Sequence, residues 1–260
     1  MRRSASTPLI AMLMLLMVCA EPSQAQHLVP PAAGIWQSQS SSYALSGAAQ
    51  KRLLASLTRI TGIERLTFDT EGRLELGTDS AWQKGSATAR QILRDVLARR
   101  DVVVLEDHSD SGMVNFGQIE GMDYRDDATN QQAVVWWIRL DFADFQRIAA
   151  PPRVRMSFDE GFTLLHELLH ALGHHDAPNP GEAGECETIL NQVRAELGLP
   201  IRAEYFATPV RSITRSLVAI RLRFLDGRHG EQPRRAQDLQ FALSILAPSV
   251  SRSAVQRQPD

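Results

Sequence analysis

Apolar residues recur at helical spacing in two stretches of the first hundred residues. The first stretch, residues 48–62, carries one apolar face and ends at Gly62, a residue type that commonly terminates helices. That apolar face consists of Leu53, Leu54, Leu57 and Ile60. Residues 86–100 repeat the helical pattern. The pattern therefore predicts two amphipathic helices in this part of the chain.

An alternating pattern predicts strands between and after these helices. Apolar and polar residues alternate on both sides of the turn sequence DTEG, residues 69–72, which indicates a β-hairpin. The apolar positions of this hairpin are Leu66, Phe68, Leu74 and Leu76. Residues 101–107 and 131–145 are predicted to be buried strands. Residues 109–130, which lie between them, are rich in turn residues and are expected to form a surface excursion.

The most apolar helix is predicted near residues 157–172. Its whole circumference is apolar, so we expect it to be buried. The apolar residues are Phe158, Phe162, Leu164, Leu165, Leu168, Leu169 and Leu172. Ser157 and Glu160 have the spacing of an N-terminal capping box, and Gly173 is expected to end the helix. Another helix is predicted over residues 182–197.

The sequence HELLHALGHHD, residues 166–176, contains four of the seven histidines in the chain. His166 and His170 are four residues apart, so on a helix their Cβ atoms lie about 5–6 Å apart on one face. Two such imidazoles suit a tetrahedral zinc ion, and H-E-x-x-H on a helix is the signature of zinc metalloproteases. Burying these polar side chains in an apolar helix is costly unless something pairs them. We therefore predict one zinc ion held by His166 and His170, with Glu167 as the general base that acts on a zinc-activated water.

The identity of a third zinc ligand stays open between two positions. Asp176 occupies the place of the last histidine in H-E-x-x-H-x-x-G-x-x-H, and Gly173 would let the chain turn back toward the metal. Asp176 is the predicted third ligand. The alternatives are glutamates on the following helix, among which Glu182 is expected to point most directly inward. The full set of alternatives for the third zinc ligand is Glu182, Glu185, Glu187, His174 and His175.

Other residues have possible roles around this site. Tyr205, one of three tyrosines, is predicted to donate a hydrogen bond to the oxyanion of the reaction. Trp136 and Trp137 could line a substrate cleft at a sheet edge, although one of two adjacent strand residues must face inward. Cys186 is expected to be a buried, unreactive thiol.

Two resemblances to known families add to this interpretation. The spacing of residues 166–176 is similar to that of snapalysin-type peptidases, which have aspartate at the last position. The run NQVRAELGLPIRAEY, residues 191–205, following HELLHALG at this distance, resembles bacterial effector-type zinc metallopeptidases over residues 50–206. This resemblance implies an α+β, zincin-like fold: a small mixed β-sheet with a buried active-site helix and a following helix. It also carries over the roles of His166, Glu167 and His170.

The N-terminus predicts the route of the protein in the cell. Two arginines precede an apolar run at residues 8–20, and a small-residue site for cleavage lies at Ala25. These are the parts of a signal peptide, residues 1–25, so a secreted or periplasmic protein without a membrane anchor is expected. A flexible leader at residues 26–47, a zincin-like domain at 48–247 and a disordered tail at 248–260 complete the predicted organisation.

Composition limits the possible partners. The chain of 260 residues is 43% hydrophobic and 22% charged, as expected of a globular protein. Its net charge of −2 gives no basic field, which argues against binding to nucleic acid. We therefore predict a secreted zinc metallopeptidase that acts on a protein or peptide substrate, with a cell-wall amidase as a variant of the same chemistry. The alternative is a binding or assembly module with a closed, purely structural zinc site. The oligomeric state stays open.

Overall fold

The computed structural model describes most of the chain between residues 32 and 244. The described ranges are 32–77, 84–109, 114–126, 130–179, 181–206, 208–212, 217–226 and 235–244. The predicted signal peptide and C-terminal tail lie outside the described residues. No helix in these ranges combines the length and the apolar character needed to cross a bilayer.

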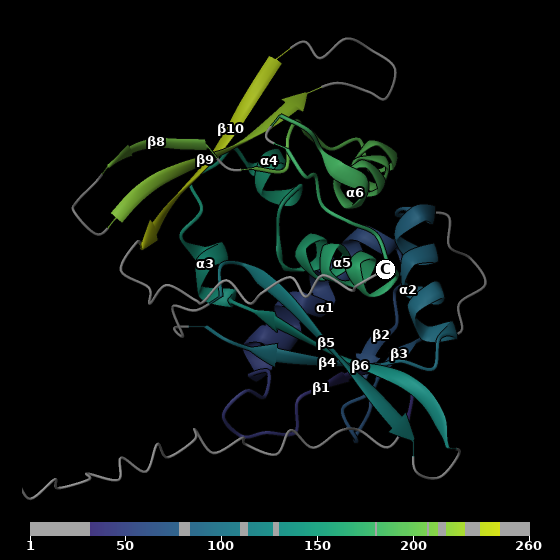
Figure 1. The fold of residues 1–260 in the computed structure, drawn as a ribbon. Helices are drawn as coiled ribbons and strands as arrows, with labels where there is room; N and C mark the ends of the chain where they lie inside the picture. The colour runs from purple at the N-terminus through teal and green to yellow at the C-terminus, as the bar shows by residue number, and fades with distance from the viewer. Residues whose placement is uncertain are drawn as a thin grey trace, which may run out of the picture.

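A four-stranded mixed sheet forms one layer of the protein (Figure 1). The strands, in spatial order, are β1 (Gly34–Gln37), β4 (Val102–Asp107), β6 (Gln131–Leu140) and β5 (Gly117–Asp126). The first three strands are parallel, and β5 pairs antiparallel to β6 at the edge. The structure thus confirms the small mixed sheet and the two predicted buried strands, although the second strand ends at Leu140 and a short helix follows.

Two segments were predicted differently from what the structure shows. Residues 34–37 belong to the expected flexible leader, yet they form β1 and pair with β4. The expected surface excursion at 109–130 contains the ten-residue strand β5. Among its side chains, Ile119 and Tyr124 are half-buried, whereas Met122 is 54% exposed. An edge strand with so little burial has no alternation of apolar residues that a sequence pattern could detect.

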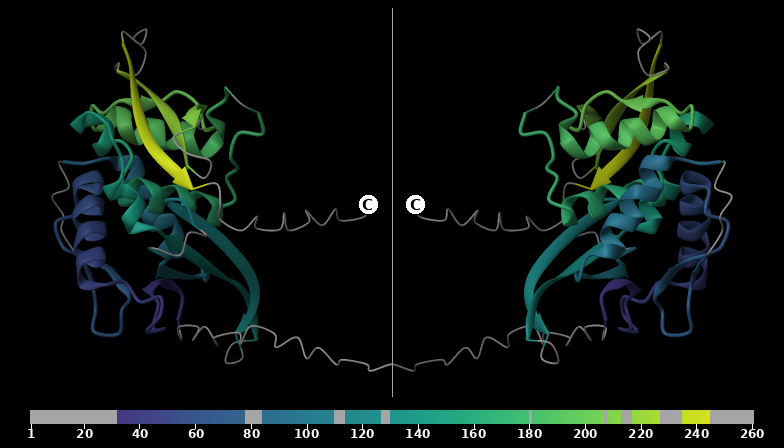
Figure 2. Two further views of the ribbon diagram at one scale, coloured as in Figure 1. Left: turned by 90° about the vertical axis from the view of Figure 1, so that its left-hand side faces the viewer. Right: turned by 90° about the vertical axis from the view of Figure 1, so that its right-hand side faces the viewer.

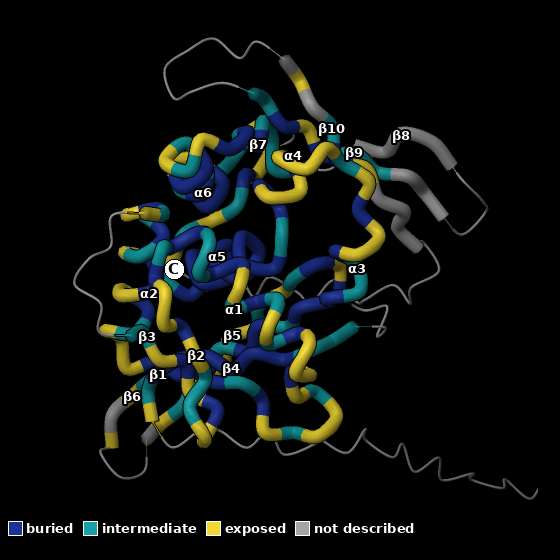
Figure 3. The backbone as a smooth tube through the Cα atoms, turned by 180° about the vertical axis from the view of Figure 1, so that it is seen from behind, coloured by how far each residue is buried: buried dark blue, intermediate teal, exposed yellow. Residues whose placement is uncertain are grey.

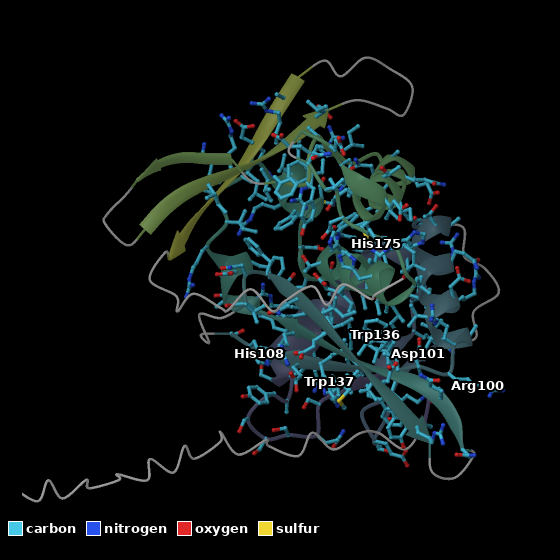
Figure 4. The ribbon with its side chains drawn as sticks, viewed as in Figure 1. Arg100, Asp101, His108, Trp136, Trp137 and His175 are labelled. Carbon is cyan, nitrogen blue, oxygen red and sulfur yellow. The ribbon has the colours of Figure 1, made fainter. Side chains whose placement is uncertain are left out.

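The two faces of this sheet carry separate apolar layers. Side chains that face the helices include Ile35, Val103, Leu105, Ile138 and Leu140. Side chains that pack on the opposite face are Trp36, Val102, Val104, Val135 and Trp137. The two adjacent tryptophans of β6 therefore pack in different layers, Trp136 with the helices and Trp137 on the opposite face. Figure 4 labels both residues on the sheet. The indole Nε1 of Trp136 donates a hydrogen bond of 3.4 Å to Asp101.

The helical layer consists of four main helices and two short ones in the described residues. They are α1 (Gly47–Thr61), α2 (Ala87–Ala98), α3 (Phe142–Gln146), α4 (Pro152–Met156), α5 (Glu160–Ala171) and α6 (Gly184–Glu196). Gly62 ends α1 with φ of 75°, as its position predicts. The predicted capping box is wrong: Asp159 caps α5 by accepting a hydrogen bond from the Phe162 amide, while Ser157 ends α4.

Helix α5 lies at the centre of the protein, between the other helices and β5, and Figure 3 shows its buried backbone. Of its twelve residues, all but His170 are buried. Gly161 lets α5 approach α1 closely, because a Cβ atom there would lie 2.4 Å from Ser56 Oγ. The sequence pattern correctly predicted the burial of this helix.

A second sheet follows α6 in the chain. Its strands are β7 (Ile201–Arg202), β8 (Thr208–Ser212), β9 (Leu217–Asp226) and β10 (Arg235–Ser244). Strand β9 pairs antiparallel with each of the other three. Figure 2 shows the two sheets at opposite ends of the molecule with α5 between them. The predicted hairpin is confirmed as β2 (Leu66–Phe68) and β3 (Leu74–Leu76).

A smaller apolar core joins the second sheet to the rest of the protein. Its rings pack edge to face around Phe158, which lies 5.0 Å from Phe116 and 6.5 Å from Phe224 between ring centroids. Leu222 and Leu239 complete this core from β9 and β10. The second sheet is therefore attached beside the N-terminal end of α5 through aromatic packing.

We predict that Gly161→Ala destabilises the protein by about 1–3 kcal/mol, the usual cost of overpacking a core contact. The added methyl would collide with Ser56 and Ile60 of α1. Gly47→Ala is the matched control, because no atom lies within 4 Å of a Cβ at that helix start. Urea denaturation of both variants measures the difference. Equal free energies of unfolding would show that α1 and α5 are not in close contact at Gly161.

Candidate metal centre

Helix α5 and the turn after it bring three potential metal ligands together. His166 Nε2 lies 3.1 Å from Asp176 Oδ1, and His170 Nε2 lies 3.3 Å from Asp176 Oδ2. The two Nε2 atoms are 3.2 Å apart. Gly173, with φ of 95°, reverses the chain after the helix, and its amide bonds the His170 carbonyl. The residues predicted from the motif and its spacing are therefore adjacent in space.

The pairwise separations are close to those between ligands of a tetrahedral metal ion, with each histidine next to a different oxygen of Asp176. Zinc–nitrogen bonds of about 2.0–2.1 Å place neighbouring ligands about 3.3–3.4 Å apart. The observed separations are 3.1, 3.2 and 3.3 Å. Asp176 Oδ1 is also buried and lies 3.1 Å from His166 Nε2. Because a buried carboxylate is costly without a positive charge beside it, the donor set is suited to a cation.

A second layer of contacts orients both histidine rings. His170 Nδ1 lies 2.9 Å from the His174 carbonyl, which can only accept a hydrogen bond, so Nδ1 carries the proton and Nε2 presents its lone pair to the cluster. His166 Nδ1 lies 3.5 Å from Glu187 Oε1. Such outer contacts are typical of histidines that bind metals.

Glu187 is the centre of a buried ion network. Its two carboxylate oxygens accept hydrogen bonds of 2.7 Å from Arg194 and Arg202. Glu187 and Arg194 are each 1% exposed. Burial raises the pKa of Glu187, but the two guanidinium groups outweigh it and hold that pKa well below its ordinary value. Glu187 is therefore ionised beside the His166 ring.

The three alternative glutamates do not join the cluster. Glu182 was expected to point inward, but this is wrong because α6 begins only at Gly184 and Glu182 is exposed. Glu185 is exposed and accepts a hydrogen bond of 3.2 Å from the His175 amide. Glu187 is buried but approaches the ring nitrogen of His166 that faces away from the cluster. Asp176 is thus the acidic residue that the structure places beside both histidines.

Glu167 lies next to the cluster and is 7% exposed. Burial raises the pKa of its carboxyl, while the nearby His166 and His170 lower it in part. Gly117 of β5 makes room for this side chain, because a Cβ at Gly117 would lie 3.1 Å from Glu167 Oε1. A carboxylate with a raised pKa in such surroundings suits general-base chemistry.

Tyr205 and Cys186 border the cluster in different ways. The Tyr205 ring stacks on His166 at 5.7 Å between centroids, and its hydroxyl lies near the Asp176 carboxylate. Burial, with help from Asp176, raises the pKa of Tyr205, so the hydroxyl keeps its proton. Burial raises the pKa of Cys186 to about 12, which leaves a neutral thiol 3.7 Å from His170 Nδ1. Cys186 is buried, as predicted.

His174, His175 and the two tryptophans are not placed to act at the cluster. His174 Nδ1 lies 3.6 Å from Glu185, and His175 is exposed. Trp136 and Trp137 pack in the two layers of the sheet. A cavity of about 240 Å³ opens beside His166 and Glu167, and neither tryptophan lines it. The sequence indicated Glu187 only as an alternative zinc ligand, not as the partner of Arg194 and Arg202, and it did not indicate Gly117. The exact start of α6 and the position of β5 reveal these roles.

Comparison with known proteins gives no further identification. No protein-family model matches the chain, and no curated protein or solved structure matches it.

The metal-free protein is expected to lose stability as the pH rises. Burial lowers the pKa of His166, but Asp176 and Glu187 outweigh burial and raise it from 6.5 to about 9. Below pH 6.5 the His166 ring is protonated in the folded and unfolded chains, so its interactions with Asp176 and Glu187 stabilise the folded protein fully. This stabilisation is lost as the pH rises through 9. The expected fall in the free energy of unfolding is about 3 kcal/mol.

Urea denaturation with a chelator across this pH range measures the effect. Asp176→Asn is the comparison variant, because it removes the charge that favours the protonated ring and should flatten the pH dependence. The same slope in both proteins would contradict the assignment to His166 and Asp176.

We also predict that Glu187→Gln destabilises the protein by about 3–5 kcal/mol, because two buried guanidinium groups lose their counter-charge. Glu185→Gln makes the same chemical change on an exposed part of the same helix and should shift stability by less than about 0.5 kcal/mol. Thermal and urea unfolding of the two variants provide the comparison. A Glu187→Gln protein as stable as Glu185→Gln would show that the network contributes little.

Proposed function

We propose that the protein is a secreted zinc metallopeptidase with a zincin-like fold. The observation that carries this proposal is the convergence of His166, His170 and Asp176, whose ligand atoms lie within 4.8 Å of one another, with the buried Glu167 beside them. The small mixed sheet, the buried helix α5 and the following helix α6 support the proposed fold. The N-terminal sequence, with its charged start and apolar run, supports export.

His166, His170 and Asp176 would hold the zinc ion. When bound, zinc supplies a Lewis acid that polarises the scissile carbonyl and makes a water molecule more acidic. Glu167 accepts the proton of the attacking water and returns it to the leaving amine. Tyr205, protonated and adjacent to the cluster, donates a hydrogen bond to the developing oxyanion.

Strand β5 supports a peptide as the substrate. It forms the antiparallel edge of the sheet and packs against α5. An exposed edge can bind an extended peptide as an additional strand through backbone hydrogen bonds. A peptide bound there would pass close to Glu167, because Gly117 of β5 contacts that carboxylate.

The structural-zinc alternative requires a fourth protein ligand. Among the described residues, the converging ligand atoms come from His166, His170 and Asp176. The glutamates that could complete a closed set are exposed or, for Glu187, committed to Arg194 and Arg202. These placements favour an open site, which a catalytic zinc needs.

Zinc content and peptide cleavage together test the proposal. Wild-type protein purified with zinc should contain near-stoichiometric metal, and Asp176→Ala should lose most of it. Glu167→Gln should keep the metal but cleave a peptide mixture about 10²–10⁴-fold more slowly, the usual contribution of a general base. Glu185→Gln should match the wild type in both measurements.

Two results would contradict the proposal. Wild-type protein that holds no zinc would remove its basis. Zinc retained with no cleavage of any peptide would favour the closed structural site instead, and cleavage unaffected by Glu167→Gln would contradict the role of Glu167 as general base.

A further inference from the structure

The main chain at Tyr205 is held by hydrogen bonds on both sides. The Tyr205 amide donates a hydrogen bond of 2.8 Å to the carbonyl of Glu182, in the segment between α5 and α6. The Tyr205 carbonyl accepts a hydrogen bond from the Arg202 guanidinium, whose Nε also donates to the Glu204 carbonyl at 3.1 Å. Tyr205 itself lies outside the helices and strands. These contacts, rather than a helix or a sheet, therefore fix the position of Tyr205.

The Arg202 guanidinium also lies against the Tyr205 ring. Its central carbon is 5.3 Å from the ring centroid. The Tyr205 ring is in turn stacked on the His166 imidazole, with an angle of 8° between the two planes. A guanidinium group over an aromatic ring is attracted to it, and more strongly where water is excluded. Arg202 therefore restrains the phenol ring as well as the main chain that carries it.

Arg202 also bonds the carboxylate oxygen that faces the candidate metal site. Its Nη1 donates a hydrogen bond of 2.7 Å to Glu187 Oε1, and the same oxygen lies 3.5 Å from His166 Nδ1. Arg194 bonds the other oxygen of Glu187, Oε2, at 2.7 Å. The two arginines thus have different positions in the ion network, and Arg202 is the one that contacts both Tyr205 and the oxygen beside His166.

The main chain of Arg202 is fixed to two other elements. Asn191 of α6 accepts a hydrogen bond from the Arg202 amide and donates one to the Arg202 carbonyl, both of 2.8 Å. Strand pairing places Arg202 opposite Phe224 of β9. The Arg202 side chain is itself buried. Since its main chain and its planar guanidinium are both held, Arg202 is a rigid support for the groups that it bonds.

We propose that Arg202 is a positioning residue, which holds the Tyr205 phenol and the Glu187 carboxylate in their places beside His166. Its contribution to catalysis rests on the proposed peptidase function, whereas the placement of Tyr205 by Arg202 does not. A hydrogen-bond donor for an oxyanion is effective when it is held in position before the reaction. Arginine suits this role because its guanidinium bonds several acceptors at once in a fixed geometry.

Two lysine substitutions separate this role from that of the ion network. Arg202→Lys keeps a positive charge beside Glu187, but one ammonium group does not reproduce the fixed fork that also bonds two backbone carbonyls. Arg194→Lys is the matched control, because Arg194 bonds the same carboxylate. Its other hydrogen bonds in the described part of the chain go to Asn191 and to the Ser157 carbonyl. Arg202→Gln is a second test variant, in which Arg194 still pairs with the buried carboxylate.

Fluorine NMR measures the placement of Tyr205 without metal or substrate. The chain contains three tyrosines, Tyr43, Tyr124 and Tyr205, so incorporation of 3-fluorotyrosine gives few signals. The signal lost in Tyr205→Phe is that of Tyr205. Arg202→Lys and Arg202→Gln should shift and broaden this signal, while the signals of the other two tyrosines keep their positions and show that the protein is folded. Arg194→Lys should leave the Tyr205 signal in place.

Two NMR results would overturn the proposal. One is a Tyr205 signal that both substitutions of Arg202 leave unchanged. The other is an equal change of this signal in Arg194→Lys, because the ion network as a whole, and not Arg202, would then place the phenol.

Peptide cleavage extends the test to the proposed reaction. Tyr205→Phe should lower kcat about 10²–10³-fold, the usual effect of removing one oxyanion donor. Arg202→Lys should lower kcat about 10–10²-fold with little change in KM, because it misplaces that donor. In the Tyr205→Phe background the same substitution should lower kcat less than about threefold, since the hydroxyl through which it acts is absent. Arg194→Lys should lower kcat by the same factor in both backgrounds.

The kinetic outcomes distinguish this inference from the peptidase function. Equal losses of kcat for Arg202→Lys in the two backgrounds would overturn the positioning role and leave the peptidase function intact. A Tyr205 signal that moves as expected, in a protein that cleaves no peptide, would support the placement of Tyr205 by Arg202 and contradict the peptidase function.

Discussion

One buried carboxylate connects the parts of this protein that the candidate site requires. Glu187 faces His166 of α5, Arg194 of its own helix and Arg202 of β7. Burying a charge is tolerable only when partners compensate it, so these three elements must keep their relative positions. Both guanidinium groups also lie against aromatic rings, Arg194 over Phe162 at 4.9 Å and Arg202 over Phe158 at 5.6 Å. The orientation of the His166 ring and the attachment of the second sheet therefore depend on the same ion network.

The parts of the fold with a strong apolar period could be predicted from the sequence. Helix α5 is apolar around its circumference, and its burial follows from that alone. The histidines four residues apart, and the glycine that reverses the chain toward Asp176, also depend only on local geometry. These local rules account for the proximity of His166, His170 and Asp176, and the prediction needed no knowledge of how distant segments pack.

Features that depend on distant contacts could not be predicted. Strand β5 is mostly exposed, with only a few half-buried side chains such as Ile119 and Tyr124, so no strong apolar pattern marks its pairing with β6. The inward position of Glu187, rather than Glu182, depends on α6 starting two residues later than the pattern indicated. The close approach of β5 to α5 at Gly117, where an added Cβ would lie 2.5 Å from Thr163 Cγ2, also depends on residues that are far apart in the sequence.

The exposed edge of β5 has a further consequence for self-association. A strand that can accept a peptide through its backbone can also accept the same strand of another copy, which is a common start of aggregation. Charged residues on β5 oppose this: Glu120, Asp123 and Arg125 are all exposed. Glu120 is further held by Arg139 of β6 at 2.9 Å. Two identical edges brought together would therefore have to accommodate these exposed charges, and the few apolar side chains of β5 would gain little burial in return.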